Sequence, residues 1–322
     1  MESTVKKTLM FAAASLLACA AHAANPILPK LFTADPAAFV ENGTVYLYVG
    51  HDQASPTDKD YVMKEWRLYS SCDMKNWVDR GSPIQPSAFK WAIGKVDAWA
   101  GDITKRDGKY YFYATVDHAS IPGRAIGVAV SDKPEGPFVD ARGSALITNN
   151  MTLETQIAWD DIDPAIFQDD DGQAYLYWGN SVLKYAKLKP NMIELDGPIH
   201  TVGVERFTEA SYLHKHNGTY YLSYSREFPE ETAYMTGPSA TGPWTYRGVI
   251  MSKNVKVKTI HQAIVEFNGR NYIIYHNAKL PGGGEYRRSV AVEEFTYNAD
   301  GTIPFIKQTK EGPAANPSAA CK

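Results

Sequence analysis

The chain of 322 residues carries 33 basic and 36 acidic side chains, a formal net charge of −3. It therefore has no strong positive field, which excludes a nucleic-acid-binding protein that relies on one. Hydrophobic residues make up 44% of the chain and aromatic residues 12%, enough to bury a sizeable core at this length.

The N-terminal segment has the pattern of a secretory signal peptide. Two lysines precede an apolar run over residues 9–21, which ends in the small-residue motif Ala21-His22-Ala23. Cleavage after this motif makes residues 1–23 the signal peptide and predicts a secreted or periplasmic protein. The run is shorter than the roughly 20 residues that a spanning helix needs, so we expect no membrane span.

A lipoprotein signal is the alternative interpretation of the same segment. Residues 16–19 then form a lipobox, and acylated Cys19 anchors the protein to a membrane. The Ala-x-Ala motif favours simple cleavage, and Leu17 is unusual for a lipobox.

After this segment, one strand-turn-strand pattern occurs five times. Each copy has a short apolar strand, an Asn-Gly or Asp-Gly turn and an alternating aromatic strand, which is a strong hairpin signal. The copies are residues 34–50, 101–116, 161–179, 208–225 and 261–277. A second turn follows each copy, so each unit provides four strands. This repetition predicts an all-β fold, a single five-bladed β-propeller over residues 24–310, with one short helix near residues 56–66.

The C-terminal residues look different from the repeats. Residues 311–322 are rich in proline and alanine, and we expect them to form a disordered tail. Cys72 and Cys321 are the cysteines left after signal cleavage, and Cys321 lies in this tail. We therefore expect no disulfide framework.

Each repeat places an ionisable residue near the start of its first strand. In a propeller these strands surround the central channel, so equivalent positions converge at one end of it. A carboxylate there is costly unless it is paired, bound to metal or used in chemistry. The residues are Asp35, Asp102, Asp163, Glu209 and His261.

Structural roles are the alternative for the acids. Asp35 and Asp163 precede prolines and could start turns, and Glu209 could bond a loop backbone. The recurrence of a carboxylate at equivalent positions in three repeats favours a shared functional site. Asp102 stands closer to its turn than the others, and we interpret it as facing the channel rather than a substrate.

Several carboxylates around one opening match the needs of glycosidic bond hydrolysis. One protonates the leaving oxygen and a second activates water or attacks carbon. A third, held near the acid, raises the pKa of the acid so that its proton is present near neutral pH. Sugar cleavage is therefore the leading hypothesis.

The segments ADPAAF at Asp35, DIDPAIF at Asp163 and FTEASYL at Glu209 resemble the acidic motifs of glycoside hydrolase family 43. The resemblance extends over essentially the whole mature chain, including HQAIVEFNG near the end. It implies that Asp35 is the general base, Glu209 the general acid, and Asp163 the residue that tunes and orients the acid. It also implies inversion at the anomeric carbon, with base and acid roughly 6.5 to 9.5 Å apart.

The same resemblance implies supporting residues. Arg287 is expected to reach the active centre, and Arg288 is interpreted as a solvated arginine. His261 is expected to help hold a calcium ion coordinated mainly by water, with a buried, hydrogen-bonded histidine as the alternative. No organic cofactor is expected.

Five further residues are candidates for substrate contact. Trp99, Trp178 and Phe228 lie where loops gather and could stack on a sugar, although each could instead pack in the core. His51 and His276 follow the second strands of the first and fifth repeats.

The motifs FTEASYL and LPGGGEYRRS resemble family members that remove arabinofuranosyl branches from xylan or act on xylosides. We therefore expect an α-L-arabinofuranosidase acting on arabinoxylan or arabinan, with a β-xylosidase, or both activities, as the alternative. A non-catalytic pentosan-binding lectin is an alternative of another class. It accounts for the aromatic residues but not for the repeated carboxylates. The linkage, exo or endo action and oligomeric state stay open.

Overall fold

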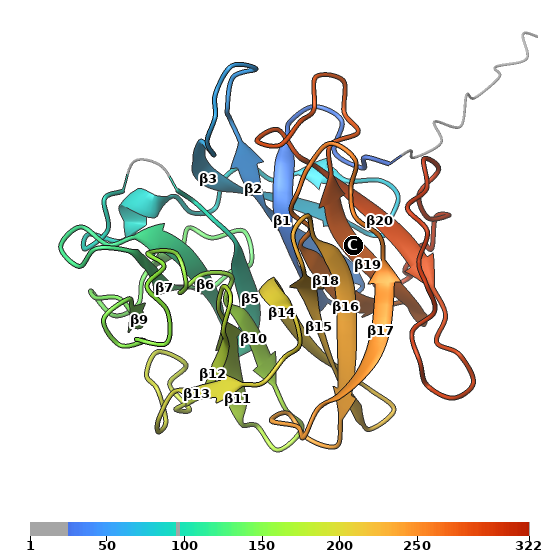
Figure 1. The fold of residues 1–322 in the computed structure, drawn as a ribbon. Coiled ribbons are helices and arrows are strands. Elements are labelled where there is room, and N and C mark those ends of the chain that lie inside the picture. Colours follow the sequence, from blue (N-terminus) through green and yellow to red (C-terminus); the bar gives the residue numbers. More distant parts are fainter. Residues whose placement is uncertain (1–24, 95–96, 322) are drawn as a thin grey trace, which may run out of the picture.

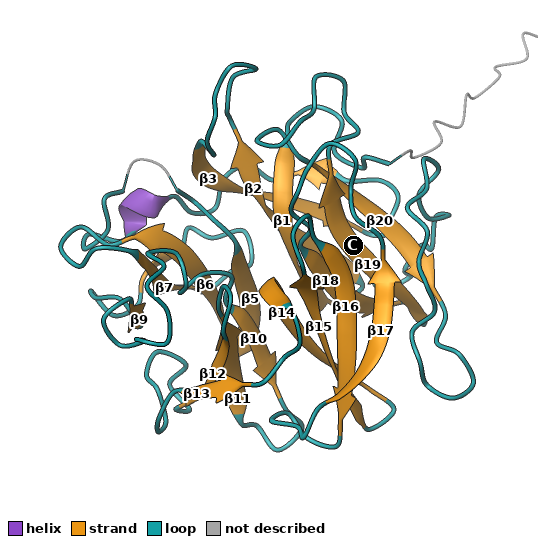
Figure 2. Cartoon of the chain, in the orientation of Figure 1, coloured by secondary structure: helices purple, strands orange, loops and turns teal. Residues whose placement is uncertain are grey.

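The computed structural model describes residues 25–94 and 97–321, so the expected signal peptide and Cys19 lie outside the described residues. The described chain is almost entirely β, with one short 3₁₀ helix at Pro86–Ala88 (Figure 2). Its sheets form the five blades of a propeller (Figure 1), which confirms the predicted fold. No helix among these residues has the length and apolar character to cross a membrane.

The blades follow one another along the chain, and the first strands of neighbouring blades contact each other in an inner ring. Blade one contains β1 (Thr33–Glu41), β2 (Thr44–Asp52), β3 (Met63–Ser71) and β4 (Val78–Asp79). Blade two contains β5 (Gly101–Arg106), β6 (Lys109–Asp117), β7 (Arg124–Ser131), β8 (Val139–Asp140) and β9 (Ile147–Thr148), which pairs with β7. Blade three contains β10 (Ala165–Gln168), β11 (Ala174–Trp178), β12 (Leu183–Leu188) and β13 (His200–Val202).

Blade four contains β14 (Phe207–His216), β15 (Thr219–Arg226), β16 (Glu231–Gly237) and β17 (Thr245–Met251). Blade five contains β18 (Gln262–Phe267), β19 (Arg270–Asn277) and β20 (Ser289–Phe295). The helix expected near residues 56–66 is absent, because residues 56–62 form a loop and β3 begins at Met63.

The inner hairpins close as their sequences predict. Four of them use two-residue turns in which both residues have φ between 47° and 78°. These are Asn42-Gly43, Asp107-Gly108, Asn217-Gly218 and Asn268-Gly269. Positive φ at both turn residues is the type I′ geometry, which matches the twist of the strands and which Asn, Asp and Gly tolerate best.

The core is divided among the interfaces between neighbouring blades. Val45 of blade one packs with Ile274 and Val292 of blade five in one cluster. Trp66 of blade one packs with Phe112 of blade two in the next. The remaining clusters join blades two to three, three to four and four to five. Each blade therefore buries its apolar faces against its neighbours, and the whole ring must close for all of them to be covered.

The first described residues help to close blade five. The Ile27 backbone N–H donates to the Val290 carbonyl over 2.9 Å. The Asn25 side chain accepts the Val292 N–H at 2.9 Å and donates to the Val292 carbonyl at 3.0 Å. Residues 25–27 thus lie along β20 and satisfy part of its outer edge.

The C-terminal tail is packed against the propeller, contrary to the expectation of disorder. Asn316 is buried and donates its side-chain N–H groups to the Phe267 carbonyl and the Tyr272 hydroxyl, both at 3.1 Å. Its backbone N–H donates to the Asp73 carbonyl in blade one at 2.9 Å. The tail therefore bridges the first and last blades. Composition did not reveal this because only a few tail residues make these contacts.

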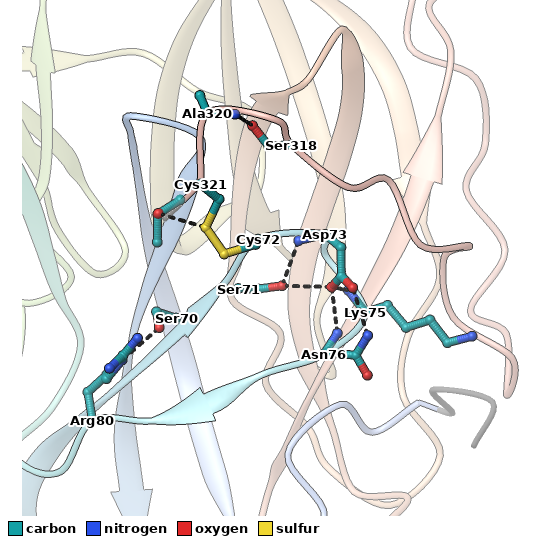
Figure 3. The surroundings of a disulfide bond; sticks show 11 residues. Ser70, Ser71, Cys72, Asp73, Lys75, Asn76, Arg80, Ser318, Ala320 and Cys321 are labelled. Atoms are coloured by element: carbon teal, nitrogen blue, oxygen red, sulfur yellow. Dashed lines mark hydrogen bonds between the residues drawn. A yellow bond between two sulfur atoms is a disulfide. The ribbon is translucent and has the colours of Figure 1, made fainter. Parts of the chain in front are cut away.

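A disulfide fixes the tail to blade one, although the sequence led us to expect no disulfide framework. Cys72 and Cys321 are joined across 249 residues of sequence, with Cα atoms 5.6 Å apart (Figure 3). The neighbouring backbone is also held, because the Ser318 N–H donates to the Cys72 carbonyl at 2.9 Å. A side chain at Gly43, whose φ is 72°, would collide with Ser318, so the first hairpin turn also requires glycine to admit the tail.

Replacing Cys321 by serine is expected to lower the free energy of unfolding by about 2 to 4 kcal/mol, because the unfolded chain regains the freedom that the crosslink removes. The unfolding midpoint in urea measures the effect. Wild-type protein in reducing agent is the matched control and should unfold at the midpoint of Cys321→Ser. A midpoint for Cys321→Ser equal to that of the oxidised wild type would contradict a stabilising crosslink.

Candidate active site

The three acids predicted to work together line one cavity of about 240 Å³. Asp35 lies near the start of β1, Asp163 lies two residues before β10, and Glu209 lies near the start of β14. Three different blades thus bring their carboxyl groups to the same end of the inner ring, as the repeat predicts. Asp35 and Asp163 are buried, whereas Glu209 is only partly buried and so remains accessible from the cavity.

Irregular backbone conformations orient the side chains of Asp35, Asp163 and Glu209 toward the cavity. Asp35 and Asp163 have φ of 51° and 58°, and Ala210, next to Glu209, has φ of 56°. The register of β1 with β2 shifts beyond Ala34, and that of β14 with β15 shifts on both sides of Glu209. Such bulges redirect a side chain from the normal alternation of a strand. Left-handed backbone at residues other than glycine costs roughly 1 to 3 kcal/mol each, so the site stores strain that the ring must hold.

Asp35 is surrounded by positive and hydrogen-bonding groups. Its Oδ1 accepts a 2.8 Å bond from Nη1 of Arg288 and lies 3.2 Å from Nδ1 of His276. Burial by itself raises the pKa of the Asp35 carboxyl, but the Arg288 charge and the contact with His276 outweigh it and hold the pKa well below its ordinary value. Asp35 is therefore a carboxylate at any pH near neutrality.

Arg288, not Arg287, reaches the acids, so the prediction for this pair is wrong. The Arg288 guanidinium is buried between Asp35 and Asp52, and its Nε and Nη2 donate to the Asp52 carboxylate, each at 2.9 Å. Arg287 instead donates its Nε to the Gly282 carbonyl at 2.7 Å, outside the cavity. Arg288 directly precedes β20, and its carbonyl accepts the Thr33 N–H of β1 at 2.9 Å. The two arginines follow a glycine-rich loop whose path the sequence does not determine, and the resemblance assigned the role to the wrong one of them.

Asp163 joins the other acids through backbone and histidine contacts. Its Oδ2 accepts the Ala210 N–H at 3.1 Å, which fixes the backbone beside Glu209. His261 Nδ1 lies 3.6 Å from Asp163 Oδ2 and 3.9 Å from Asp35 Oδ1. Burial, followed by the negative charges of Glu209 and Asp35, raises the pKa of Asp163 well above its ordinary value. The contact with Ala210 supports the orienting role, whereas tuning of the acid by Asp163 stays a prediction.

Glu209 has the protonation behaviour of an acid catalyst. Burial raises its pKa to about 7, and the Asp35 charge adds to the increase, against a lowering by the hydrogen bond from Asn180 and by the Arg288 charge. The Asn180 Nδ2 donates to Glu209 Oε2 at 2.8 Å and orients the carboxyl group. A substantial fraction of Glu209 therefore carries a proton near pH 7, while Asp35 does not.

A further buried carboxyl, Glu230, lies near Glu209 and was missed by the sequence reasoning. One oxygen of Glu230 accepts the Ile260 N–H at 2.7 Å, whereas its Oε1 has no hydrogen-bond partner among the described residues. Burial and the charge of Glu209 raise the pKa of Glu230 well above its ordinary value. A Glu230 that keeps its proton adds no negative charge beside the Glu209 carboxylate left after proton transfer. Its segment, FPEET, starts an outer-facing strand and carries no signal for such a role.

Some of the predicted substrate-contact residues line the cavity and others do not. Trp99 lines the cavity, whereas Trp178 is fully buried between blades two and three and donates to Asp161 at 2.8 Å. Phe228 is exposed at the β15–β16 turn, outside the cavity lining. His51 lies 2.8 Å from Glu65, also outside that lining. The predictions for Trp178, Phe228 and His51 are therefore not supported, because strand direction and loop path, not proximity in sequence, decide which side chains reach the cavity.

His276 contacts the catalytic residue Asp35 but does not line the cavity. Its side chain is fully buried beside Asp35, and its Nε2 lies 3.2 Å from Oγ1 of Thr259. It therefore holds Asp35 in place instead of lining the cavity.

Tyr61 and Trp159 do line the cavity and were not predicted, because they lie on loops outside the repeated hairpins. Trp159 is about half exposed, as a sugar-stacking surface requires.

Asp102 and His261 are the two remaining ionisable residues that the sequence placed near the starts of inner strands. Asp102 accepts the N–H groups of Ile103 and Ile166, both at 2.8 Å, and so ties blade two to blade three outside the cavity lining. Burial lowers the pKa of His261 to about 4, so its imidazole is neutral and able to bind a metal. Among the described residues no group of three or more His, Cys, Asp or Glu side chains could hold a metal ion.

A proton donor and an ionised carboxylate facing one small, aromatic-lined cavity provide the two charges that cleavage of an acetal linkage requires. On a five-bladed propeller this combination defines the class of glycoside hydrolases. Comparison with known proteins agrees. The model of the family described as glycosyl hydrolases family 43 matches residues 23–303.

Curated relatives and solved structures carry the same assignment. A xylosidase/arabinosidase of Bacteroides ovatus is 34% identical over 88% of this chain and 98% of its own length. A structure of a β-xylosidase/α-arabinofuranosidase from a compost metagenome, with xylotriose, has a TM-score of 0.79 at 32% identity, over 88% and 97% of the two chains. A Clostridium thermocellum α-L-arabinofuranosidase has a TM-score of 0.74 at 37% identity, over 89% and 97%. The chain belongs to family 43 of the glycoside hydrolases.

Activity is expected to fall as the pH rises through about 7, because Glu209 then loses the proton that the leaving group needs. Replacing Glu209 by glutamine should lower turnover of natural glycosides by about 10² to 10⁴-fold and remove this basic limb. The pH dependence of kcat measures both effects. Glu205→Gln, at an exposed acid in the preceding loop, is the matched control and should behave as wild type. A basic limb that persists in Glu209→Gln would assign the acid to another residue.

The adjacent arginines provide a second matched pair. Arg288→Lys keeps a positive charge but cannot bridge Asp35 and Asp52 together, so we expect kcat/KM to fall about 100-fold through misplacement of Asp35. The pKa of Asp35 should rise toward its ordinary value, which moves the acidic limb of the pH profile to higher pH. Arg287→Lys should leave both quantities near wild type. Equal effects of the two substitutions would contradict the placement of Arg288.

Proposed function

We propose that the protein is an inverting α-L-arabinofuranosidase that releases arabinose from arabinoxylan or arabinan. The observation that carries the proposal is the placement of Asp35, Asp163 and Glu209 on one cavity, where the pKa of Asp35 is held low and that of Glu209 is raised to about 7. The names of the relatives support this substrate class, since they include an arabinoxylan arabinofuranohydrolase of Bacillus subtilis.

The mechanism follows from these roles. Asp35 accepts a proton from a water molecule, whose oxygen forms a bond to the anomeric carbon of the sugar. The bond from that carbon to the leaving oxygen breaks at the same time, and Glu209 gives its proton to the leaving oxygen. Attack from the face opposite the leaving group inverts the anomeric configuration. Arg288 keeps Asp35 ionised, and the Asn180 amide stabilises the Glu209 carboxylate that forms.

The size and lining of the cavity support removal of terminal sugars. Its volume, about 240 Å³, is below the roughly 300 Å³ of a typical drug-sized pocket, which suits one pentose better than a chain segment. Trp99, Tyr61 and Trp159 offer aromatic surfaces for the sugar and for the linkage beyond it. A β-xylosidase, or an enzyme with both activities, is the second candidate, because relatives bear both names.

Location and metal binding complete the proposal. We propose that cleavage after Ala23 releases a secreted or periplasmic enzyme, with anchoring at Cys19 as the alternative. Neutral His261 would offer a calcium ion a single protein ligand, and water would provide the rest of the shell. A cation there would add positive charge near Asp35 and Asp163. No organic cofactor is needed by this chemistry.

Incubation with arabinoxylan, arabinan and xylo-oligosaccharides, followed by chromatography and proton NMR of the first-formed product, tests the proposal. We expect arabinose in the β-anomeric form from α-linked substrates, because water attacks the face opposite the leaving group. Glu209→Gln is the matched inactive control. Release of xylose alone would favour the second candidate, and an α-anomeric first product would contradict inversion. Binding of pentosans without sugar release would leave only the lectin alternative.

A further inference from the structure

A second hollow, larger than the catalytic cavity, lies between blade four and blade five. This basic groove has a volume of about 710 Å³ and is walled by residues 252–256, 277–279 and 305–310, with Asn25 at one side. It shares no lining residue with the catalytic cavity. Its lining includes five lysines and no acidic residue: Lys253, Lys256, Lys279, Lys307 and Lys310.

The positive charge of the groove is largely uncompensated. Lys253 pairs with Glu227 at 3.2 Å, but within the described chain no carboxylate lies within ion-pair distance of the other four lysines. The chain as a whole carries a net charge of −3, so this concentration of lysine is not a general property of its surface. Like charges around one hollow repel each other, and an anion bound among them relieves that repulsion.

A buried amide gives the groove a polar floor. Asn277 lines the groove and is only 1% exposed, and its Nδ2 has no hydrogen-bond partner among the described residues. Its Oδ1 is already used, since it accepts from the Ser289 hydroxyl at 2.8 Å and the Lys279 N–H at 3.0 Å. A buried donor without a partner costs free energy, which a ligand oxygen at this position would recover.

The walls are held in place rather than loose. Asn254 donates its Nδ2 to the His276 carbonyl at 3.1 Å, and Gln308 donates its Nε2 to the Ser252 carbonyl at 3.0 Å. The Ile306 N–H donates to the Ile250 carbonyl at 2.7 Å. Phe305, in the same lining, is 60% exposed. The groove thus combines a preformed shape, cationic side chains and an exposed aromatic ring.

These features point to an acidic glycan. We propose that the groove binds the carboxylate-bearing sugars of a uronic-acid-substituted polysaccharide, with the lysines taking the carboxylate and Phe305 stacking on a sugar ring. Carboxylates form charge-assisted hydrogen bonds with lysine, and pyranose faces stack on exposed aromatic rings. The choice of a glycan rests on the proposed function, in which the catalytic cavity acts on a plant polysaccharide.

The groove lies close enough to the catalytic cavity for one polysaccharide to occupy both. Thr259 lines the cavity, and Asn254, five residues earlier in the same loop, lines the groove. Five residues span at most about 18 Å when fully extended, a distance of a few sugar units. On the other wall, Asn277 directly follows His276, which contacts Asp35. The groove therefore positions the polymer while the cavity removes a terminal sugar.

Titration calorimetry with the full mature chain carrying Glu209→Gln tests the proposal without hydrolysis. The probes are a xylo-oligosaccharide bearing one glucuronic acid and the same compound with its carboxyl group reduced to an alcohol. We expect the acidic probe to bind at least about tenfold more tightly, and this difference to shrink at high ionic strength. Adding Lys256→Glu and Lys307→Glu should abolish the preference, because two of the five groove lysines then carry negative charge.

The matched control adds Lys133→Glu and Lys187→Glu, two exposed lysines of blades two and three, and should keep the preference at the same net charge. Melting temperatures confirm that both double variants are folded. Equal binding of the two probes by the parent protein, or an undiminished preference in the groove variant, would overturn the proposal. Binding of anionic phospholipid vesicles, but not of the acidic probe, through Lys256 and Lys307 would overturn it in favour of a membrane surface.

Failure of the proposed function has a separate readout. It would appear as absence of arabinose and xylose release by the wild-type protein, whereas the calorimetric comparison measures binding in the groove by itself.

Discussion

The buried contact between Arg288 and Asp35 joins the last blade to the first and also establishes the chemistry of the site. Both carboxylates that hold this arginine, Asp35 and Asp52, come from blade one, whereas the arginine directly precedes β20. A guanidinium buried with only one partner would leave an uncompensated charge, so the contact favours the closed ring. The same charge keeps Asp35 ionised beside a protonated Glu209. The contact that closes the ring therefore also helps to set the different protonation states of Asp35 and Glu209.

The neighbouring contacts extend this linkage around the inner ring. Asp163 accepts a backbone N–H from blade four, Asp102 accepts one from blade three, and Gln262 donates to the Ala210 carbonyl at 2.7 Å. These polar contacts tie inner strands whose apolar faces are covered only by adjacent blades. They also hold the left-handed backbone at the acids, which no single blade could maintain against its strain. The propeller is thus the support that allows strained, desolvated carboxyl groups to persist.

The chain termini contribute to the same closure and shape the outer surface. Residues 25–27 lie along β20, and the tail crosses to blade one, where Cys321 is crosslinked to Cys72. The segment that leads into this tail forms one wall of the basic groove. Its position is maintained by Glu293, whose carboxylate accepts from the backbone and side chain of Thr309. Closure of the ring, anchoring of the tail and the form of the groove are parts of one arrangement.

The amino-acid sequence by itself determined the features that depend on short-range patterns. The Asn-Gly and Asp-Gly turns, the five repeats, and the carboxyl groups of Asp35, Asp163 and Glu209 near the starts of inner strands are all readable locally, because turn geometry and strand alternation act over a few residues. Tertiary structure alone decided which of Arg287 and Arg288 faces the acids, that Trp178 packs between blades, that Glu230 lies near Glu209, and that the tail is held by a disulfide. Each of these depends on the path of an irregular segment or on contacts between residues far apart in the chain, and no local pattern encodes either.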